Sequence, residues 1–108
     1  MGDAGAESFA KVLIKNKTLT QLDLSNNIIG NRGACLIASA LEKNVTLKNL
    51  NLSKNRIGDK GAIALANALK VNKTLAELDI SNNEYGSDVI THFSQLIKTS
   101  KTIIKLAN

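Results

Sequence analysis

Several residue types that would mark a particular class of protein are missing or scarce. The chain has no proline and no tryptophan, its aromatic residues amount to 3%, and its only cysteine is Cys35. A single cysteine excludes an internal disulfide, and without a Cys/His cluster we expect neither a metal ion nor a cofactor. No apolar run approaches the ~18 residues of a membrane span, and no basic and apolar leader is present. These absences favour a cytoplasmic, reducing location, without signal peptide or transmembrane segment.

The residues that are present favour one domain with an aliphatic core. The chain has 108 residues, of which 44% are apolar, and this length is typical of a single domain. Because aromatic residues are scarce, Leu, Ile, Val and Ala must fill the interior. The net charge is +5, which raises the question of an anionic partner, and the answer depends on where the charges lie.

A repeat of 28 residues runs through the chain. The stretch LTQLDLSNNIIG, beginning at Leu19, returns as LKNLNLSKNRIG at Leu47 and as LAELDISNNEYG at Leu75. A period in this range predicts a solenoid, in which each unit buries its apolar face against its neighbours.

The same period divides residues 1–108 into units. A partial repeat covers 1–18, repeats start at 19, 47 and 75, and a terminal strand covers 103–108. In this register Ile103 falls in the column of Leu19, and Leu106 falls in the column of Leu22.

Within each unit the hydrophobic period changes from two residues to about 3.6. Leu22 and Leu24 alternate with polar residues, which predicts a half-buried strand. A glycine and then apolar residues at i, i+3, i+4 and i+7 predict an amphipathic helix. We expect a side-chain cap at each helix start and a left-handed asparagine after three of the helix ends. The caps are Asp3, Asn31, Asp59 and Ser87, and the asparagines are Asn16, Asn44 and Asn72.

The pattern LxxLxLSxN followed by IGxxGAxxLAxxL resembles the leucine-rich repeat family, in its ribonuclease-inhibitor-like subclass. The resemblance implies an α/β fold, namely a right-handed solenoid that forms a short horseshoe arc with parallel strands on the concave side and helices on the convex side. It also implies a buried row of asparagines that bind backbone groups where each strand bends away. Those positions are Asn27, Asn55 and Asn83, and we expect them to hold structure rather than to bind a ligand.

The family resemblance implies a non-catalytic scaffold for protein–protein interaction, and we expect no catalytic residue. The concave strand face should bind the partner through polar, mildly acidic residues, with two charged residues on the adjoining loops as a rim. The face residues are Gln21, Asp23, Asn49, Asn51, Glu77 and Asp79, continued by Lys105 and Ala107, and the rim residues are Arg56 and Glu84. A basic partner fits this surface. A solvated strand face without a ligand has equal weight, because the surface carries no Trp or Tyr.

Seven lysines cluster at the predicted turns after the helices, and we call them the lysine edge. They are Lys15, Lys17, Lys43, Lys70, Lys73, Lys98 and Lys101. Cations at helix C-termini complement the helix dipole. Because no arginine or aromatic residue lies among them, we expect neither nucleic acid nor a membrane as partner. Binding of an anionic ligand at this edge stays an alternative, as does a GTPase-activating regulator resembling the Ran-type activators.

Four further expectations concern one end of the array and three single residues. No strand precedes the first one, so its free edge favours a homo-oligomer as one option. The ring of Tyr85 should pack in the core with its hydroxyl in water. His92 should lie on a helix surface, and Cys35 should be unreactive.

Overall fold

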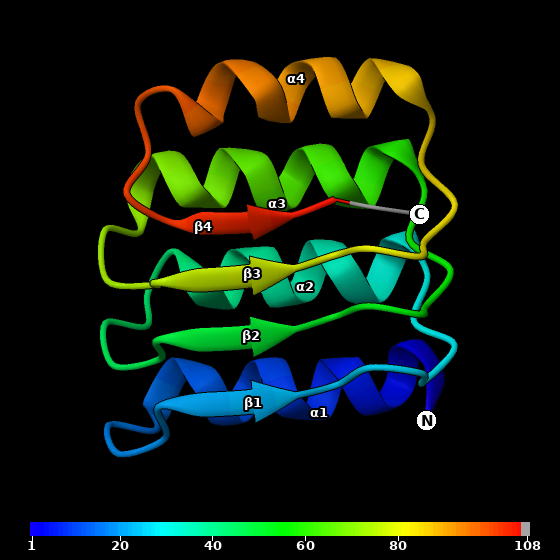
Figure 1. The fold of residues 1–108 in the computed structure, drawn as a ribbon. Coiled ribbons are helices and arrows are strands. Elements are labelled where there is room, and N and C mark those ends of the chain that lie inside the picture. Colours follow the sequence, from blue (N-terminus) through cyan, green and yellow to red (C-terminus); the bar gives the residue numbers. More distant parts are fainter. Residues whose placement is uncertain (107–108) are drawn as a thin grey trace.

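The computed structural model describes residues 1–106, in which helices and strands alternate along the chain. In chain order the elements are α1 (Gly2–Lys15), β1 (Gln21–Asp23), α2 (Asn31–Leu41), β2 (Asn49–Asn51), α3 (Asp59–Val71), β3 (Glu77–Asp79), α4 (Ser87–Ile97) and β4 (Ile103–Lys105). The strands form one parallel sheet in the order β1-β2-β3-β4, and the helices lie in a second layer behind it (Figure 1). This architecture confirms the predicted α/β solenoid.

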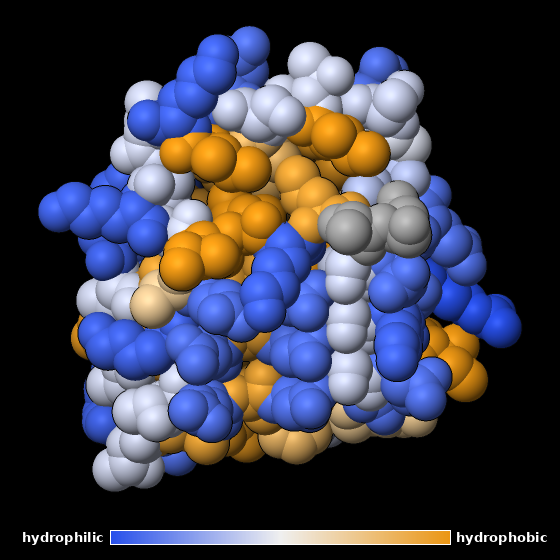
Figure 2. All heavy atoms as spheres, viewed as in Figure 1, coloured by the Kyte–Doolittle hydropathy of each residue, from blue (hydrophilic) through white to orange (hydrophobic). Residues whose placement is uncertain are grey.

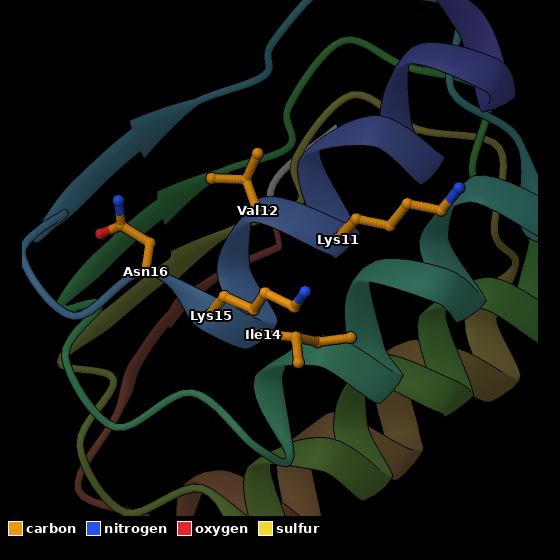
Figure 3. Close-up of a pocket in the computed structure, with 5 residues that line it drawn as sticks. All are labelled: Lys11, Val12, Ile14, Lys15 and Asn16. Carbon is orange, nitrogen blue, oxygen red and sulfur yellow. The ribbon is translucent and has the colours of Figure 1, made fainter.

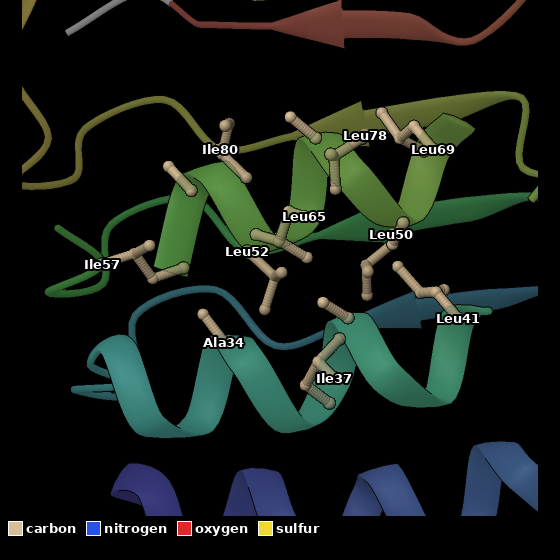
Figure 4. Close-up of a cluster of buried hydrophobic side chains, with 14 of the residues drawn as sticks. Ala34, Ile37, Leu41, Leu50, Leu52, Ile57, Leu65, Leu69, Leu78 and Ile80 are labelled. Atoms are coloured by element: carbon tan, nitrogen blue, oxygen red, sulfur yellow. The ribbon is translucent and has the colours of Figure 1, made fainter. Parts of the chain in front are cut away.

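Rows of leucines hold successive units together. Leu22 lies opposite Leu50 and Leu50 opposite Leu78, so that each strand adds one side chain to the same row. Leu50 and Leu78 are buried. Figure 4 shows them with helix residues such as Ile37 and Leu65 in the aliphatic layer between strands and helices. No unit could bury these side chains alone, so the stack itself creates the core.

Two glycines allow the helices to approach closely. A Cβ atom added at Gly61 would lie 2.8 Å from the Cβ of Ala34 on α2, and Gly33 faces Ala6 on α1 in the same way. In α4 the equivalent position is Val89, which is fully buried. Because a valine cannot fit where a single Cβ already overlaps, α4 packs less closely on α3 than the other helices do on their neighbours.

The helices begin near the predicted residues, but the capping prediction is wrong. No helix has a side-chain cap at its own N-terminus. Instead, Asp3 Oδ1 accepts hydrogen bonds from the N–H groups of Gly30 (2.8 Å) and Gly33 (3.1 Å), one unit further on. Because helix starts stack in register, a first-turn side chain lies beside the exposed N–H groups of the next helix. Asn31 and Asp59 bond to the following unit in the same way, so these three residues join units rather than cap their own helix.

The asparagines after the helix ends are not left-handed, which corrects a second prediction. Asn16 and Asn72 have extended backbone, with φ of −76° and −78°. Asn72 is buried, its Oδ1 accepts from Leu75 N at 2.8 Å, and its Nδ2 donates to Leu41 O at 2.7 Å. A second row of structural asparagines thus lies at this end of the units. The non-glycine residues with positive φ lie after the strands; within residues 1–106 they are Asn26, Ile28, Lys54 and Asn82.

The last strand is shifted by two residues from the 28-residue register. Ile104 lies opposite Leu78, where the repeat predicted Leu106, and Ile103 is 62% exposed instead of buried. Side chains of a strand alternate between faces, so a shift of two keeps the apolar residues on the inner face. The chain is still in register just before, where the Thr102 hydroxyl donates to Leu75 O at 2.8 Å. Ala107 and Asn108 lie outside the described residues.

The expectation for Tyr85 was half right. Its ring is buried, but its hydroxyl donates a hydrogen bond to the carbonyl of Leu106 at 2.8 Å rather than to water. The segment after β4 lies against the ring and supplies this acceptor. Burial raises the pKa of Tyr85 above its usual value, and the charge of Asp79 adds to the effect.

The first strand is one of the two edge strands of the sheet. β1 has a strand partner on one side only within the described residues, and its Leu22 is half-buried where Leu50 and Leu78 are buried. Self-association through this edge stays a prediction. Among residues 1–106, no helix has the length and apolar character needed to cross a membrane.

Candidate functional site

A shallow hollow of about 410 Å³ runs across the strand face. Its lining comes from all four strands and consists of Gln21, Leu22, Asp23, Asn49, Leu50, Asn51, Glu77, Asp79 and Lys105. Figure 2 shows this face in front: hydrophilic residues cover the region of β1 to β3, and an apolar area lies near β4 and α4. The hollow therefore combines carboxylates, amides and one ammonium group on a flat sheet.

The strands place these residues in two parallel rows. Gln21, Asn49 and Glu77 are register partners and form one row. The second row is formed in the same way by Asp23, Asn51 and Asp79. Since residues two apart on a strand point to the same face, the two rows lie side by side. The sheet thus presents six polar side chains on a rigid base.

A serine two residues later fixes each side chain of the second row. Asp23 Oδ1 accepts hydrogen bonds from the Ser25 hydroxyl (2.6 Å) and the Ser25 N–H (2.9 Å). Asn51 and Asp79 accept the same pair of bonds from the serines that follow them. One oxygen of each aspartate is therefore occupied, and the other accepts no hydrogen bond from residues 1–106.

Hydrogen bonding also keeps Asp23 charged. The Ser25 hydroxyl lowers the pKa of Asp23 below its usual 3.8, and the Ser25 N–H adds to the effect, because both bonds favour the carboxylate form. The carboxylate therefore remains ionised at any physiological pH.

Lys105 adds a positive charge to the strand face at β4, the last strand of the sheet. Its Nζ lies 3.2 Å from Glu77 Oε2, and by register it lies opposite Asp79. Three carboxylates and one ammonium group line the hollow, which gives it a charge of −2 although the whole chain carries +5. The uncompensated negative charge is that of Asp23 and Asp79.

The structure brings six of the eight predicted binding residues together. Arg56 and Glu84 do not line the hollow; they are exposed on the loops that follow β2 and β3. Ile28, which was not among the predicted residues, occupies the same position of the repeat as these two. Ile28 is 58% exposed and has φ of +60°, a backbone conformation that is rare for a β-branched residue. Because Ile28 shares its repeat position with Arg56 and Glu84, the 28-residue repeat could have identified it.

Beneath the rim loops, the asparagines bind backbone groups between units. Asn55 Oδ1 accepts from the N–H groups of Asn27 (2.9 Å) and Ile29 (3.0 Å), and its Nδ2 donates to Leu24 O at 3.0 Å. Asn83 Oδ1 accepts from Ile57 N at 3.0 Å in the same manner. These contacts fix the loops that carry the rim, and they leave the asparagine side chains turned inward.

Other candidates lie away from this face. His92 lies on α4 and is half-buried, and its Nε2 has no hydrogen-bond partner within the described residues. Cys35 is a half-buried free thiol. A shallow groove on the C-terminal half of α1 is lined by Lys11, Val12, Ile14, Lys15 and Asn16 (Figure 3). No group of three or more His, Cys, Asp or Glu side chains within residues 1–106 is placed to hold a metal ion.

The fold and the repeat agree with a known family. A sequence profile described as "Leucine Rich repeat" matches residues 15–38 and 43–66, which are two successive copies of the turn, strand and helix. These two copies of the repeat therefore match the leucine-rich repeat family in sequence.

Two solved structures resemble the chain over almost its whole length. The structure described as "Leiomodin-1 Actin-Binding Site 2" shares 30% sequence identity with a TM-score of 0.89, over 99% of this chain and 63% of that one. A tropomodulin C-terminal domain from Caenorhabditis elegans has a TM-score of 0.82 at 14% identity, over 95% of this chain and 64% of that one. The second likeness concerns the fold alone. The chain spans slightly less than two thirds of both structures, and a search of curated proteins gave no significant match.

Proposed function

We propose that this protein is a non-catalytic binding module that recognises another protein through its strand face. The observation that carries the proposal is the set of six polar side chains presented in two rows across β1, β2 and β3. The face is rigid, because each residue of the second row is fixed by the following serine. A preorganised surface loses little conformational entropy on binding, which favours specific recognition.

The chemistry of the face defines the partner. Asp23 and Asp79 each offer one free carboxylate oxygen, and Asn49, Asn51 and Gln21 offer amide donors and acceptors. A surface with lysine or arginine side chains among backbone groups matches this pattern. The partner would approach between the rim residues Arg56 and Glu84, and the exposed Ile28 supplies an apolar contact at the same rim.

We further propose actin as the partner and the ribonuclease-inhibitor-like type as the subclass of repeat. The structure at 30% identity is described as an actin-binding site of leiomodin-1, and the 28-residue period fits the long repeats of that subclass. An actin partner agrees with the cytoplasmic location that the single cysteine favours.

The test uses a variant that removes charge without disturbing the turns. Asn51 accepts from the hydroxyl and N–H of Ser53 just as Asp23 accepts from those of Ser25. Asp23→Asn with Asp79→Asn should therefore keep the fold and abolish the acidic patch. We expect at least tenfold weaker binding in actin co-sedimentation and an unchanged melting curve, since a charge-assisted contact is worth about 1.5–3 kcal/mol.

A matched control removes the same amount of charge elsewhere. Glu42 and Asp88 are exposed and lie away from the hollow, so Glu42→Gln with Asp88→Asn should bind actin like the wild type. Unimpaired binding by the Asp23/Asp79 variant would exclude the strand face. Failure of the wild-type protein to bind either filamentous or monomeric actin would exclude actin itself.

A further inference from the structure

The lysine edge is a second charged surface, separate from the strand face. Its seven residues belong to three columns of the repeat, which begin at Ile14, Lys15 and Lys17 and recur every 28 residues. All twelve positions of these columns are exposed. Figure 1 shows that the four helix-to-strand turns lie on one side of the molecule, at the side of the sheet rather than on its front. A ligand on this side would leave the hollow on the strand face open.

The positive charge of the protein is concentrated on this side. The three columns contain seven lysines and one acidic residue, Glu42, and therefore carry +6. The rest of the chain then carries −1, since the total is +5. Ion pairs within residues 1–106 involve Lys11, Arg32 and Lys105, so none of the seven lysines is neutralised there. Such a concentration of unpaired cations attracts an extended anionic surface.

Exposed aliphatic side chains lie among these lysines. Val45 is 60% exposed and occupies the column of Lys17, while Val71 is 59% exposed and occupies the column of Lys15. Ile14, which begins the first column, is 38% exposed, and Ile97, next to that column, is 44% exposed. Aliphatic side chains at positions that otherwise hold lysine are not stabilised by contact with water. They become favourable when the edge meets a surface that is apolar just beneath its charges.

We propose that the lysine edge docks onto the surface of an anionic lipid bilayer. Each lysine is a point charge, and point charges suit a fluid layer of phosphate and carboxylate headgroups. Clusters that bind such a layer typically contain four to eight of these residues. Protein interfaces favour arginine and aromatic residues and are depleted in lysine. Single-stranded nucleic acids need aromatic platforms. Neither arginine nor an aromatic residue occurs in the three columns, so the lipid surface is the favoured partner.

This proposal reverses our expectation from the sequence that no membrane is bound. That expectation relied on the missing arginine and aromatic residues, which a diffuse layer of headgroups does not require. The structure adds that the valines and lysines share one exposed side. Docked in this way, the protein would present its strand face to a protein near the membrane.

The experiment measures co-sedimentation of the full chain with vesicles of phosphatidylcholine containing about 30 mol% phosphatidylserine. Lys70→Gln, Lys73→Gln and Lys101→Gln together should weaken binding about 100-fold, because each lysine near such a surface contributes about fivefold. Wild-type binding should fall steeply when salt is raised from about 0.05 M to about 0.5 M. Vesicles of phosphatidylcholine alone should bind weakly.

A matched triple variant distinguishes the effect of the lysine edge on vesicle binding from the effect of net charge alone. Lys11, Lys54 and Lys60 are exposed and lie outside the three columns. Their replacement by glutamine lowers the net charge by the same three units and should leave vesicle binding within about threefold of wild type.

A third variant tests the aliphatic part. Val45→Ser with Val71→Ser keeps every charge and should weaken vesicle binding about tenfold at low and high salt alike. Equal losses in the two triple variants, or equal binding to neutral vesicles, would overturn the proposal. Stronger binding to polyglutamate would overturn it in favour of an acidic protein, and stronger binding to a single-stranded oligonucleotide in favour of nucleic acid. Because actin is absent from these assays, their outcome is independent of the proposed function.

Discussion

The side-chain oxygen of Asn55 accepts the backbone N–H of Asn27, one repeat earlier, at 2.9 Å. The same oxygen accepts from Ile29 N, and the amide nitrogen donates to three carbonyls, two of its own loop and one of the preceding unit. A single side chain thus satisfies backbone groups that the turning strands leave without partners. Hydrogen bonding between repeats, as well as apolar packing, makes the stack cooperative.

Asn55→Ala should lower the free energy of unfolding by about 3 kcal/mol or more, because it leaves buried backbone groups without partners. Urea denaturation followed by circular dichroism gives this value. Asn27→Ala is the internal control. Among the described residues the Asn27 side chain bonds only to Ser25 O of its own loop, so this substitution should cost about 1 kcal/mol or less. Equal effects of the two substitutions would show that the contacts between repeats are not important.

Ser100→Asn should stabilise the protein. Ser100 occupies the repeat position of Asn72, and within residues 1–106 its hydroxyl accepts one hydrogen bond, from Thr102 N at 3.0 Å. Asn72 also donates to Leu41 O and Asn44 O of the preceding unit, and an asparagine at position 100 would reach the equivalent carbonyls. We expect a gain of about 1 kcal/mol, seen as a rise of about 4–8 °C in melting temperature. An unchanged or lower melting temperature would argue against the second asparagine row.

Gly61→Ala should destabilise the protein by about 1–3 kcal/mol, although alanine favours a helix by about 1 kcal/mol. The added Cβ would lie 2.8 Å from Ala34 Cβ and 3.0 Å from Ile57 Cγ2, so α3 must move away from α2. At Gly86 the nearest atom to an added Cβ is Asp59 Oδ1 at 3.8 Å. Gly86→Ala should therefore cost less than about 1 kcal/mol. Thermal melts of both variants test the contrast.

The stability of the protein should fall at alkaline pH through Tyr85. Burial raises its folded-state pKa above the unfolded value of 10.0, so its contribution is complete below pH 10.0 and is lost as pH rises through the folded pKa. Tyr85 is the sole tyrosine, and its ultraviolet absorbance reports the titration directly. Tyr85→Phe should remove this pH dependence and cost about 1 kcal/mol at neutral pH, because it loses the bond to Leu106 O. A normal pKa would contradict burial of the hydroxyl.

The strand-face residues were predictable because they follow from a periodic rule. Once Leu22 and Leu24 were recognised as inward-facing, Asp23 had to face outward, and the repeat carried that assignment to Asn51 and Asp79. The electrostatic details were not predictable. That the Ser25 hydroxyl occupies one oxygen of Asp23, or that Lys105 reaches Glu77, depends on side-chain rotamers and on the shifted register of β4. No local pattern encodes these features.

The sequence alone predicted the solenoid, the order of its elements and the side chains that line its interior. It could do so because hydrophobic periods of two and about 3.6 residues fix the inner face of each strand and helix, and a constant repeat fixes their stacking. The tertiary structure was needed to show which units the polar side chains join, since Asp3 reaches Gly30 and Asn72 reaches Leu41 across the stack. It also decided the register of the last strand and brought Val45 and Val71 among the lysines. Such contacts depend on how neighbouring units sit against each other, which is a property of packing and not of any one segment.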